Sequence, residues 1–231
     1  CGGRSGPAAR QGQGDGSGTL VMTPADIDAF FTTLQAANPQ PVTELAYTSV
    51  FELLAAVLLS AQATDAGVNK ATRELFKIAD TPQKMLDLGE KGLIAHIKTI
   101  GLYKTKARNV MKMAQILVED FGGEVPNSRA ALQSLPGVGR KTANVVLNMW
   151  WQQPAQAVDT HIFRVGNRAG IALGKTVDQV ERAIEDNVPA DFQLHAHHWL
   201  ILHGRYICVA RNPKCRTCII SDLCQFEEKT Q

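Results

Sequence analysis

The segment Leu135–Ala143 constrains the fold of this chain more than any other, because it reads Leu-Pro-Gly-Val-Gly-Arg-Lys-Thr-Ala. Pro136 disfavours helical backbone in the residue before it, which ends the preceding helix. Gly137 and Gly139 permit a tight turn and leave backbone N–H groups exposed. An apolar helix is predicted to begin at Arg140. The pattern is therefore a helix, a glycine hairpin and a second helix whose bare amides favour a bound phosphate.

Lys141 occupies the first turn of this second helix. The positive end of the helix dipole and the neighbouring Arg140 both disfavour a protonated amine there, and a nucleophilic lysine must be unprotonated. A Gly-x-Gly-x-Lys string on its own is more often a hairpin that carries a solvated lysine. Two further features favour the chemical interpretation: Asp159 follows eighteen residues later within Val-Asp-Thr-His, and four cysteines lie near the C-terminus.

Together, the hairpin with its lysine, the segment Val158–Val165 and the Cys-x6-Cys-x2-Cys-x5-Cys set resemble the endonuclease III family. This is a family of bifunctional DNA glycosylases and abasic-site lyases within the helix–hairpin–helix glycosylase superfamily. The likeness runs from about Met22 to the end of the chain and includes Leu58–Thr64 and Thr99–Tyr103. It implies base excision repair, in which oxidised pyrimidines are removed from duplex DNA through a lysine Schiff base and β-elimination.

Helical spacing of apolar residues runs through most of the chain and predicts an all-α protein. Residues 51–59 are apolar on nearly all sides, which predicts a central buried helix. A helix is also expected soon after Met22, and alternation with a period of two is not convincing anywhere. Further helices are predicted over 65–78, 82–88, 91–98, 104–120, 127–134, 140–151, 160–170, 177–187 and 193–207.

The spacing does not reveal a domain boundary, but the resemblance implies the two-domain helix–hairpin–helix glycosylase fold. One domain would be a six-helix unit over 43–153, and the other a helical iron–sulfur domain made of 22–42 plus 154–231. Lys141 and Asp159 would then face each other across a cleft. Residues 1–21 are rich in glycine, so we expect a disordered tail or a mis-called gene start, in preference to a lipidated N-terminal cysteine.

Composition alone does not point to a partner. The 231 residues carry a formal net charge of +2, and the longest uninterrupted apolar stretch, 53–59, is too short to cross a bilayer. Basic residues are nevertheless clustered without acidic ones over 91–112 and over 205–216. Such runs fit solvated helix faces as well as a DNA-binding face, and the resemblance favours DNA. We expect a soluble monomer that acts on damaged duplex DNA in the cytoplasm of a bacterium, at the nucleoid, without a membrane.

By the resemblance, Lys141 is the nucleophile that attacks C1′ of the damaged nucleotide. Asp159 would stabilise the positive charge that develops on the sugar. Asp159 is equally well placed to cap the helix predicted from Thr160. We expect it to do both, with one oxygen on the helix amides and the other toward the cleft.

An extruded nucleotide leaves a gap in the duplex that must be filled. The resemblance assigns Gln62 to this gap and Leu102 to a wedge between base steps. The residues alone fit the polar end of a buried helix and an apolar turn residue equally well. Ser60 is assigned to the base pocket. The remaining DNA contacts that the resemblance implies are Gly137, Gly139, Arg140, His161, Arg211 and Lys214.

The four cysteines favour an iron–sulfur cluster. Zinc sites with four cysteines usually combine two Cys-x2-Cys pairs, whereas this set contains one, and disulfides are rare in a reducing compartment. The compact spacing suits a [4Fe–4S] cluster, which the resemblance also implies. Such a cluster would hold the loop 209–214 against DNA phosphates. The expected ligands are Cys208, Cys215, Cys218 and Cys224.

Some residues receive no role. Gln133 departs from the family pattern, which has a glutamate at this position, and this departure argues against an acid–base function there. His195, His197, His198 and His203 are interpreted as surface and core histidines of one helix.

Two other interpretations stay open. An adenine-type monofunctional glycosylase shares the hairpin and the cluster, but its pattern lacks a lysine at the position of Lys141 and adds a C-terminal recognition domain. A non-catalytic DNA-binding module would use the hairpin and the cluster loop only to hold phosphates.

Overall fold

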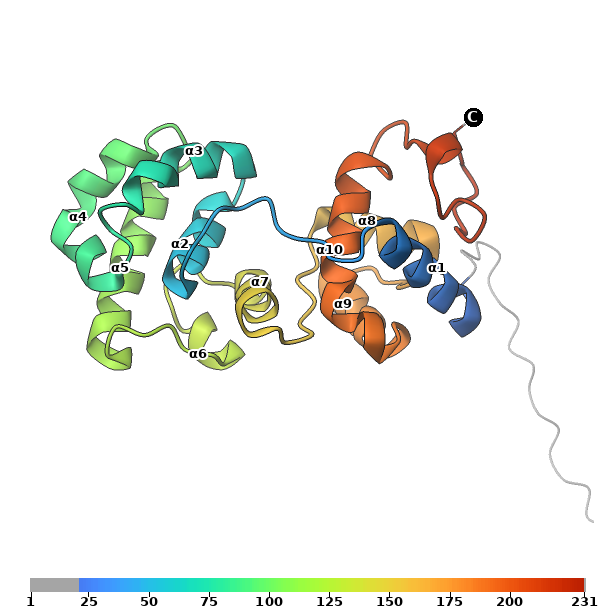
Figure 1. The fold of residues 1–231 in the computed structure, drawn as a ribbon, viewed down its shortest axis with the longest axis horizontal. Coiled ribbons are helices and arrows are strands. Elements are labelled where there is room, and N and C mark those ends of the chain that lie inside the picture. Colours follow the sequence, from blue (N-terminus) through green and yellow to red (C-terminus); the bar gives the residue numbers. More distant parts are fainter. Residues whose placement is uncertain (1–20, 231) are drawn as a thin grey trace, which may run out of the picture.

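The computed structural model describes residues 21–230, and within this range the secondary structure is helical, without strands. The expectation of disorder over 1–21 concerns residues that, apart from Val21, lie outside the described range. The helices are α1 (Pro24–Ala37), α2 (Val50–Ser60), α3 (Asp65–Leu75), α4 (Pro82–Ile97), α5 (Tyr103–Phe121), α6 (Arg129–Gln133), α7 (Arg140–Trp151), α8 (Thr160–Ala169), α9 (Val177–Asn187), α10 (Ala190–Tyr206) and a 3₁₀ turn at Cys215–Thr217 (Figure 1).

The all-α prediction is confirmed, and so is the interruption predicted between residues 88 and 91. Two separate helices are predicted over 82–88 and 91–98, and α4 consists of two helical stretches that meet at a kink at Gly89, whose φ is 72°. Glycine adopts this left-handed backbone without the steric cost that other residues meet. Among the described helices, none is long and apolar enough to cross a membrane.

Helices α2 to α7 form one lobe, which lies on the left in Figure 1. Its core draws on residues from 45 to 157. Helix α2 lies at the centre, since every residue from Phe51 to Leu59 is buried. Ser49 caps this helix by accepting a hydrogen bond from the amide of Glu52. The prediction of a central buried helix is therefore confirmed.

Helices α1, α8, α9 and α10 form the second lobe together with the C-terminal loop (Figure 1). Its core draws on residues 22–34 and 158–220, two segments far apart in sequence. Phe31 of α1 stacks on Phe192 at 5.7 Å and lies 6.2 Å from the Trp199 ring, both of α10. The first helix of the chain thus completes a core made mostly from its last third. The domain boundaries implied by the resemblance stay a prediction.

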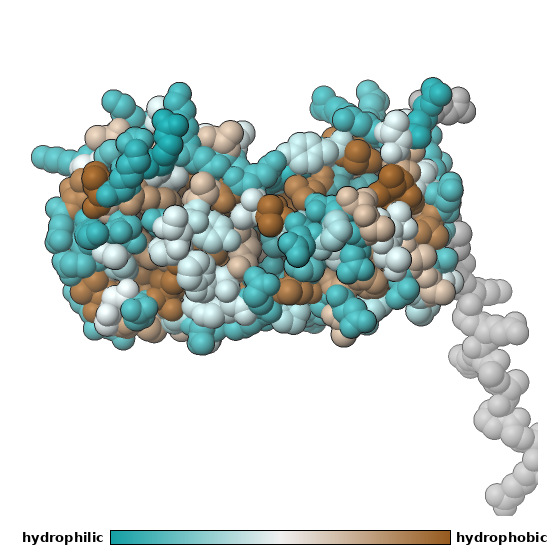
Figure 2. Space-filling model, in the orientation of Figure 1, coloured by the Kyte–Doolittle hydropathy of each residue, from teal (hydrophilic) through white to brown (hydrophobic). Residues whose placement is uncertain are grey.

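Residues 38–49, called the linker below, cross from α1 to α2 along the boundary between the lobes (Figure 1). The indole N–H of Trp199 donates to the carbonyl of Asn38 at 2.8 Å. Asn69 of α3 donates to the carbonyl of Glu44 at 2.7 Å, and its side-chain oxygen accepts from the amide of Ala46 at 2.9 Å. The linker is therefore held by both lobes. On the face seen in Figure 2 the surface is largely hydrophilic and dips where the lobes meet.

A buried carboxylate also joins the lobes. Glu181 of α9 is 4% exposed and accepts from Arg140 of α7 through both oxygens, at 2.8 to 3.1 Å. The side-chain amide of Asn144 donates to the same carboxylate at 2.9 Å and to the carbonyl of Gln156 at 2.7 Å. The hydrogen bond to Glu181 raises the pKa of Arg140 above its usual value. This network fixes the start of α7 against the second lobe.

Replacing Glu181 by alanine should destabilise the protein, because the Arg140 guanidinium and the Asn144 amide then lose their shared acceptor. We expect a loss of about 2 to 3 kcal/mol in the free energy of unfolding. Glu181→Gln keeps an acceptor oxygen and should cost less than half as much. Urea unfolding of the protein measures both, with Glu185→Ala on the exposed face of α9 as the control. An equal effect of Glu181→Ala and Glu185→Ala contradicts the assignment.

Candidate active site and cluster-binding loop

The glycine hairpin has the geometry that its sequence predicts. Helix α6 ends before Leu135, whose carbonyl accepts from the amide of Val138 at 3.1 Å. Gly137 has a φ of 81°, and a Cβ at this position would lie 2.8 Å from the side-chain nitrogen of Asn109. Gly139 precedes α7, and no described side chain caps that helix. The first amides of α7 are therefore open to an anion.

Lys141 is exposed and lines a cavity of about 500 Å³ between the lobes. The side chains around it come from the end of α2, the start of α3 and the last turns of α10. Arg140, its neighbour, is turned to Glu181, which offsets its positive charge within the protein. A DNA contact by Arg140 stays a prediction. The polar groups that share the cavity with Lys141 are Thr43, Glu44, Ser60, Asp65, His197, His198 and Arg205.

Asp159 caps α8, and its two oxygens have different partners. Oδ1 accepts from the amides of His161 at 2.9 Å and Ile162 at 3.0 Å. Oδ2 lies 3.0 Å from Nδ1 of the His161 ring. Oδ2, the oxygen that we expect to face the cleft, is thus paired with the His161 imidazole. Oδ1 caps the start of α8, as the sequence predicts.

The charge on Asp159 is stabilised by its surroundings. Burial by itself raises the pKa of this carboxyl. The hydrogen bonds from the Ile162 amide and the His161 ring, with electrostatic contributions from the nearby His161 and Lys141 side chains, outweigh burial and bring the pKa below its usual value. Asp159 is therefore an ionised carboxylate, and Lys141 is near enough for its charge to contribute to the lowered pKa.

His161 also lines the outer opening of the cleft. This opening is a second cavity, of about 930 Å³, between the start of α3 and the end of α10. Arg205 spans its edge, because NH1 donates to Asp65 and to Glu44, both at 2.6 Å. The Tyr206 hydroxyl also donates to Glu44. Linker, α3 and α10 are thus joined by charged groups at the opening.

Two histidines to which the sequence assigned no function form part of the wall beside Lys141. His197 and His198 of α10 are 4% and 8% exposed. Within residues 21–230, the Nδ1 atom of each is buried without a hydrogen-bond partner. Burial lowers the pKa of His197 to about 3, with help from His198 and Lys141, and lowers that of His198 to about 4. Both rings are therefore neutral at pH 7. Only the folded structure reveals that these two histidines lie beside Lys141. In the sequence, their helical spacing fits buried core histidines equally well.

Gln62 and Leu102 lie on two adjacent loops. A Cβ added to Gly101 would be 3.8 Å from the carbonyl oxygen of Gln62, so the loops are in contact. Gln62 has a φ of 54° and Leu102 a φ of 60°, a left-handed backbone that is unfavourable for side chains with a Cβ. Leu102 is 61% exposed despite being apolar. Ser60, nearby at the end of α2, donates to the carbonyl of Val57 at 2.8 Å and lines the Lys141 cavity.

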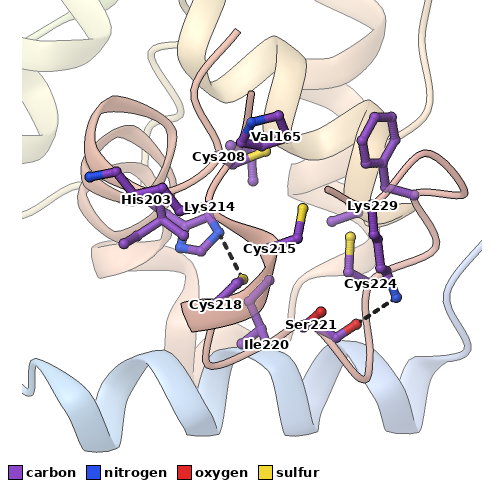
Figure 3. Close-up of a pocket in the computed structure, with 14 residues that line it drawn as sticks. Val165, His203, Cys208, Lys214, Cys215, Cys218, Ile220, Ser221, Cys224 and Lys229 are labelled. Atoms are coloured by element: carbon purple, nitrogen blue, oxygen red, sulfur yellow. Dashed lines mark hydrogen bonds between the residues drawn. The ribbon is translucent and has the colours of Figure 1, made fainter. Parts of the chain in front are cut away.

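The four cysteines of the C-terminal loop surround one cavity of about 390 Å³ (Figure 3). They are free thiols. In the described part of the chain, no three His, Cys, Asp or Glu side chains converge on one ion position. The four sulfurs instead border one shared cavity, and four thiolates are the usual ligands of a [4Fe–4S] cluster. Burial raises the pKa of the Cys218 and Cys224 thiols, and bound iron would supply the positive charge that thiolates need.

Arginines of α8 hold this loop. Arg168 donates to the carbonyls of Val209 at 2.8 Å and Ala210 at 3.0 Å, and its NH1 lies 3.7 Å from the sulfur of Cys208. His203 of α10 lies with Nε2 3.6 Å from the sulfur of Cys218, as the dashed line in Figure 3 marks. Arg168 and His203 thus place nitrogen atoms near two of the sulfurs, which fits the hydrogen bonding usual around the thiolate ligands of a cluster. Arg211 and Lys214 lie exposed on the same loop.

Comparison with known proteins agrees with this architecture. Residues 55–190 match the family of HhH-GPD superfamily base excision DNA repair proteins, and residues 208–224 match the iron–sulfur binding domain of endonuclease III. The fold and the site therefore define a base excision DNA repair protein of the helix–hairpin–helix type.

Individual relatives narrow this class. Endonuclease III of Escherichia coli strain K12 is 60% identical over 198 residues, which cover 86% of this chain and 94% of that protein. Endonuclease III of Haemophilus influenzae is 58% identical, covering 87% of this chain and 95% of that protein. A solved structure of a trapped endonuclease III–DNA covalent intermediate superposes with a TM-score of 0.83 at 41% identity, covering 88% of this chain and 96% of that one.

The chain belongs to the endonuclease III family of the HhH-GPD superfamily. It is a DNA-binding base excision repair glycosylase with abasic-site lyase activity, and Cys208, Cys215, Cys218 and Cys224 are placed to hold its [4Fe–4S] cluster.

The two buried imidazoles predict that the enzyme loses stability on mild acidification. In the unfolded chain each takes up a proton near the ordinary pKa of 6.5, whereas in the folded protein each stays neutral down to about 3 for His197 and about 4 for His198. The unfolded state therefore binds more protons between these values, so stability is complete above pH 6.5 and falls below it. From about pH 7 to about pH 5 we expect a loss of about 2 kcal/mol for each histidine.

Urea unfolding of the holoenzyme at a series of pH values measures this loss. His198→Asn should flatten the pH dependence, while His96→Asn on α4, outside the cleft, should keep the wild-type slope. An unfolding midpoint that is constant over the whole range would show that these rings are not neutral and buried in solution.

Proposed function

We propose that this enzyme excises oxidised or ring-saturated pyrimidines from duplex DNA, with Lys141 as the nucleophile. The observation that carries the proposal is the position of Lys141 in the cleft between the lobes, where its charge reaches the Asp159 carboxylate. A relative of known structure is described as a trapped covalent intermediate with DNA, which supports a covalent step here. The presence of Lys141 also argues against an adenine-type monofunctional enzyme.

In the first step the neutral amine of Lys141 attacks C1′ as the bond from C1′ to the base breaks. The electron pair of that bond leaves with the base, which takes up a proton. Asp159, kept ionised by its hydrogen bonds, stabilises the positive charge that develops on the sugar. Loss of a proton from the nitrogen and opening of the sugar ring give a Schiff base between Lys141 and C1′.

In the second step a proton leaves C2′ and the bond from C3′ to its oxygen breaks, which nicks the strand. Water then hydrolyses the imine and frees Lys141. The Schiff base makes the C2′ proton acidic, because its nitrogen accepts the electron pair. The same lysine thus serves glycosylase and lyase chemistry.

Several parts of the protein surface around the cleft are expected to hold the DNA. We propose that the bare amides of α7 at Gly137 and Gly139 bind a phosphate, and that Arg211 and Lys214 on the cluster loop bind others. Gln62 fills the gap left by the extruded nucleotide, and Leu102 wedges between base steps. Their adjacent loops and left-handed backbones support this role, because both side chains are held outward before DNA arrives.

Three further assignments rest on the same site. Ser60 and His161 line the pocket that receives the nucleotide, and Arg140 positions the hairpin through Glu181. The enzyme acts as a monomer, because the cleft and the hairpin are complete within one chain. It acts in the bacterial cytoplasm at the nucleoid, which the DNA substrate and the bacterial relatives support.

The nucleophile is tested by reducing the Schiff base with borohydride on abasic-site DNA. Wild-type enzyme should give a covalent enzyme–DNA adduct, and Lys141→Ala should give none, because the attacking nitrogen is absent. Lys175→Ala, on an exposed loop of the second lobe, is the matched control and should react as wild type. A wild-type protein that binds this DNA without forming an adduct would instead be a binding module.

The carboxylate is tested with Asp159→Asn. An asparagine oxygen still accepts from the amides of α8, so thermal stability should change little. The single-turnover rate of base excision should fall about 100-fold or more, since the negative charge beside the sugar is lost. A wild-type single-turnover rate in this variant would leave Asp159 with its capping role alone.

A further inference from the structure

The cleft continues beyond Lys141 into a third space. Three names are used here: the mouth is the cavity beside His161, the chamber is the cavity that Lys141 lines, and the rear groove is a depression of about 840 Å³. The rear groove is bordered by the linker, the C-terminal half of α7 and the N-terminal half of α10.

The order of these spaces can be followed along α10. Arg205 and Tyr206, at its C-terminal end, line the mouth, and His197 lines the chamber. His195 lines the rear groove. His195 and Arg205 are ten residues apart, so the mouth and the rear groove are separated by about 15 Å along the helix.

The other two walls give the same order. On α7, Lys141 lines the chamber and Gln152 the rear groove. On the linker, Glu44 lines the mouth and the chamber, whereas Gln40 lines only the rear groove. Helix α10 and the linker thus both place the chamber between the mouth and the rear groove, and α7 places the chamber next to the rear groove.

A single layer of side chains parts the chamber from the rear groove. Val42, Thr43, Met149 and His198 line both spaces. Val42 is 72% exposed, and methionine is an unbranched side chain that changes rotamer readily. Rotation of these two side chains would widen the passage between the chamber and the rear groove.

The rear groove has a chemistry different from that of the mouth. Glu44, Asp65 and Arg205 make the mouth charged. The described residues that border the rear groove include no Lys, Arg, Asp or Glu, but they do offer the amides of Gln40 and Gln152. Such a surface suits a neutral heterocycle with carbonyl and N–H groups and does not attract a phosphate.

DNA closes the mouth while the reaction proceeds. The mouth is bordered by Ala63 and Asp65, directly after Gln62, so a duplex held by Gln62 covers it. Once the sugar is bonded to Lys141, the DNA cannot leave, and the excised base is confined to the chamber. We propose that the free pyrimidine base leaves the chamber through the rear groove before the DNA dissociates. This proposal rests on the proposed function, in which Lys141 holds the sugar covalently.

The test uses holoenzyme and a duplex with one ring-saturated thymine that is radiolabelled in the base. Samples are divided at each time point: borohydride reduction measures the adduct, and rapid ultrafiltration measures free base that has left the protein. Gln40→Trp and Gln152→Trp each narrow the rear groove from a different wall, and both positions are exposed. Gln35→Trp on the exposed face of α1 lines none of the three spaces and is the matched control.

In wild type and in Gln35→Trp, free base should enter the filtrate in step with the adduct, while the DNA is still on the enzyme. In both groove variants its appearance should be delayed about ten-fold, because the route of product release is narrowed. Strand cleavage at a preformed abasic site should be unchanged, since no base is then released.

Two results would overturn the proposal. One is base that stays with the wild-type enzyme until the DNA dissociates, or that leaves both groove variants at the wild-type rate. The other is a groove variant in which strand cleavage at an abasic site is slowed by as large a factor as release of the base. That result would mean that the substitution disturbs the chemistry itself. Failure of the proposed function is distinguishable, because wild-type enzyme would then form no adduct at all.

Discussion

The position of Lys141 depends on an ion pair one residue away, between Arg140 and the buried carboxylate of Glu181. Glu181 accepts from Arg140 through both oxygens, and Asn144, one turn further along α7, donates to the same carboxylate. Since Glu181 belongs to the second lobe, α7 is fixed to both lobes at the point where the hairpin ends. Lys141 therefore has a defined direction into the cleft, although its own side chain is exposed.

The cleft separates charged groups from neutral ones in a way that suits the chemistry. Asp159 keeps its negative charge because hydrogen bonds from α8 outweigh burial, whereas burial keeps His197 and His198 uncharged. In the proposed reaction, Asp159 is therefore a carboxylate when positive charge develops on the sugar. The neutral rings of His197 and His198 add no positive charge beside Lys141, whose amine would have to be unprotonated to react.

Local patterns predicted the helices and the hairpin well, because Pro136, Gly137 and the caps act over a few residues. The interruption of α4 at Gly89 was predicted in the same way, because the glycine separates two stretches of helical spacing. The pairing of Arg140 with Glu181 spans 41 residues and has no local signal. The histidines of α10 were likewise uninformative until the lobes placed them beside Lys141. The roles of Lys141 and Asp159 came from the family resemblance and not from spacing.

The order of helices along the chain has a consequence for biosynthesis. Helix α1 leaves the ribosome first, but Trp199, which binds the carbonyl of Asn38, is 161 residues further on. The helices of the first lobe can pack as they emerge, because their core is drawn from one continuous stretch of chain. The core of the second lobe joins residues 22–34 to residues 158–220, so Phe30 and Phe31 of α1 stay uncovered until the chain as far as α10 has been synthesised. The second core is therefore expected to form after the first, although α1 precedes every helix of the first lobe in the chain.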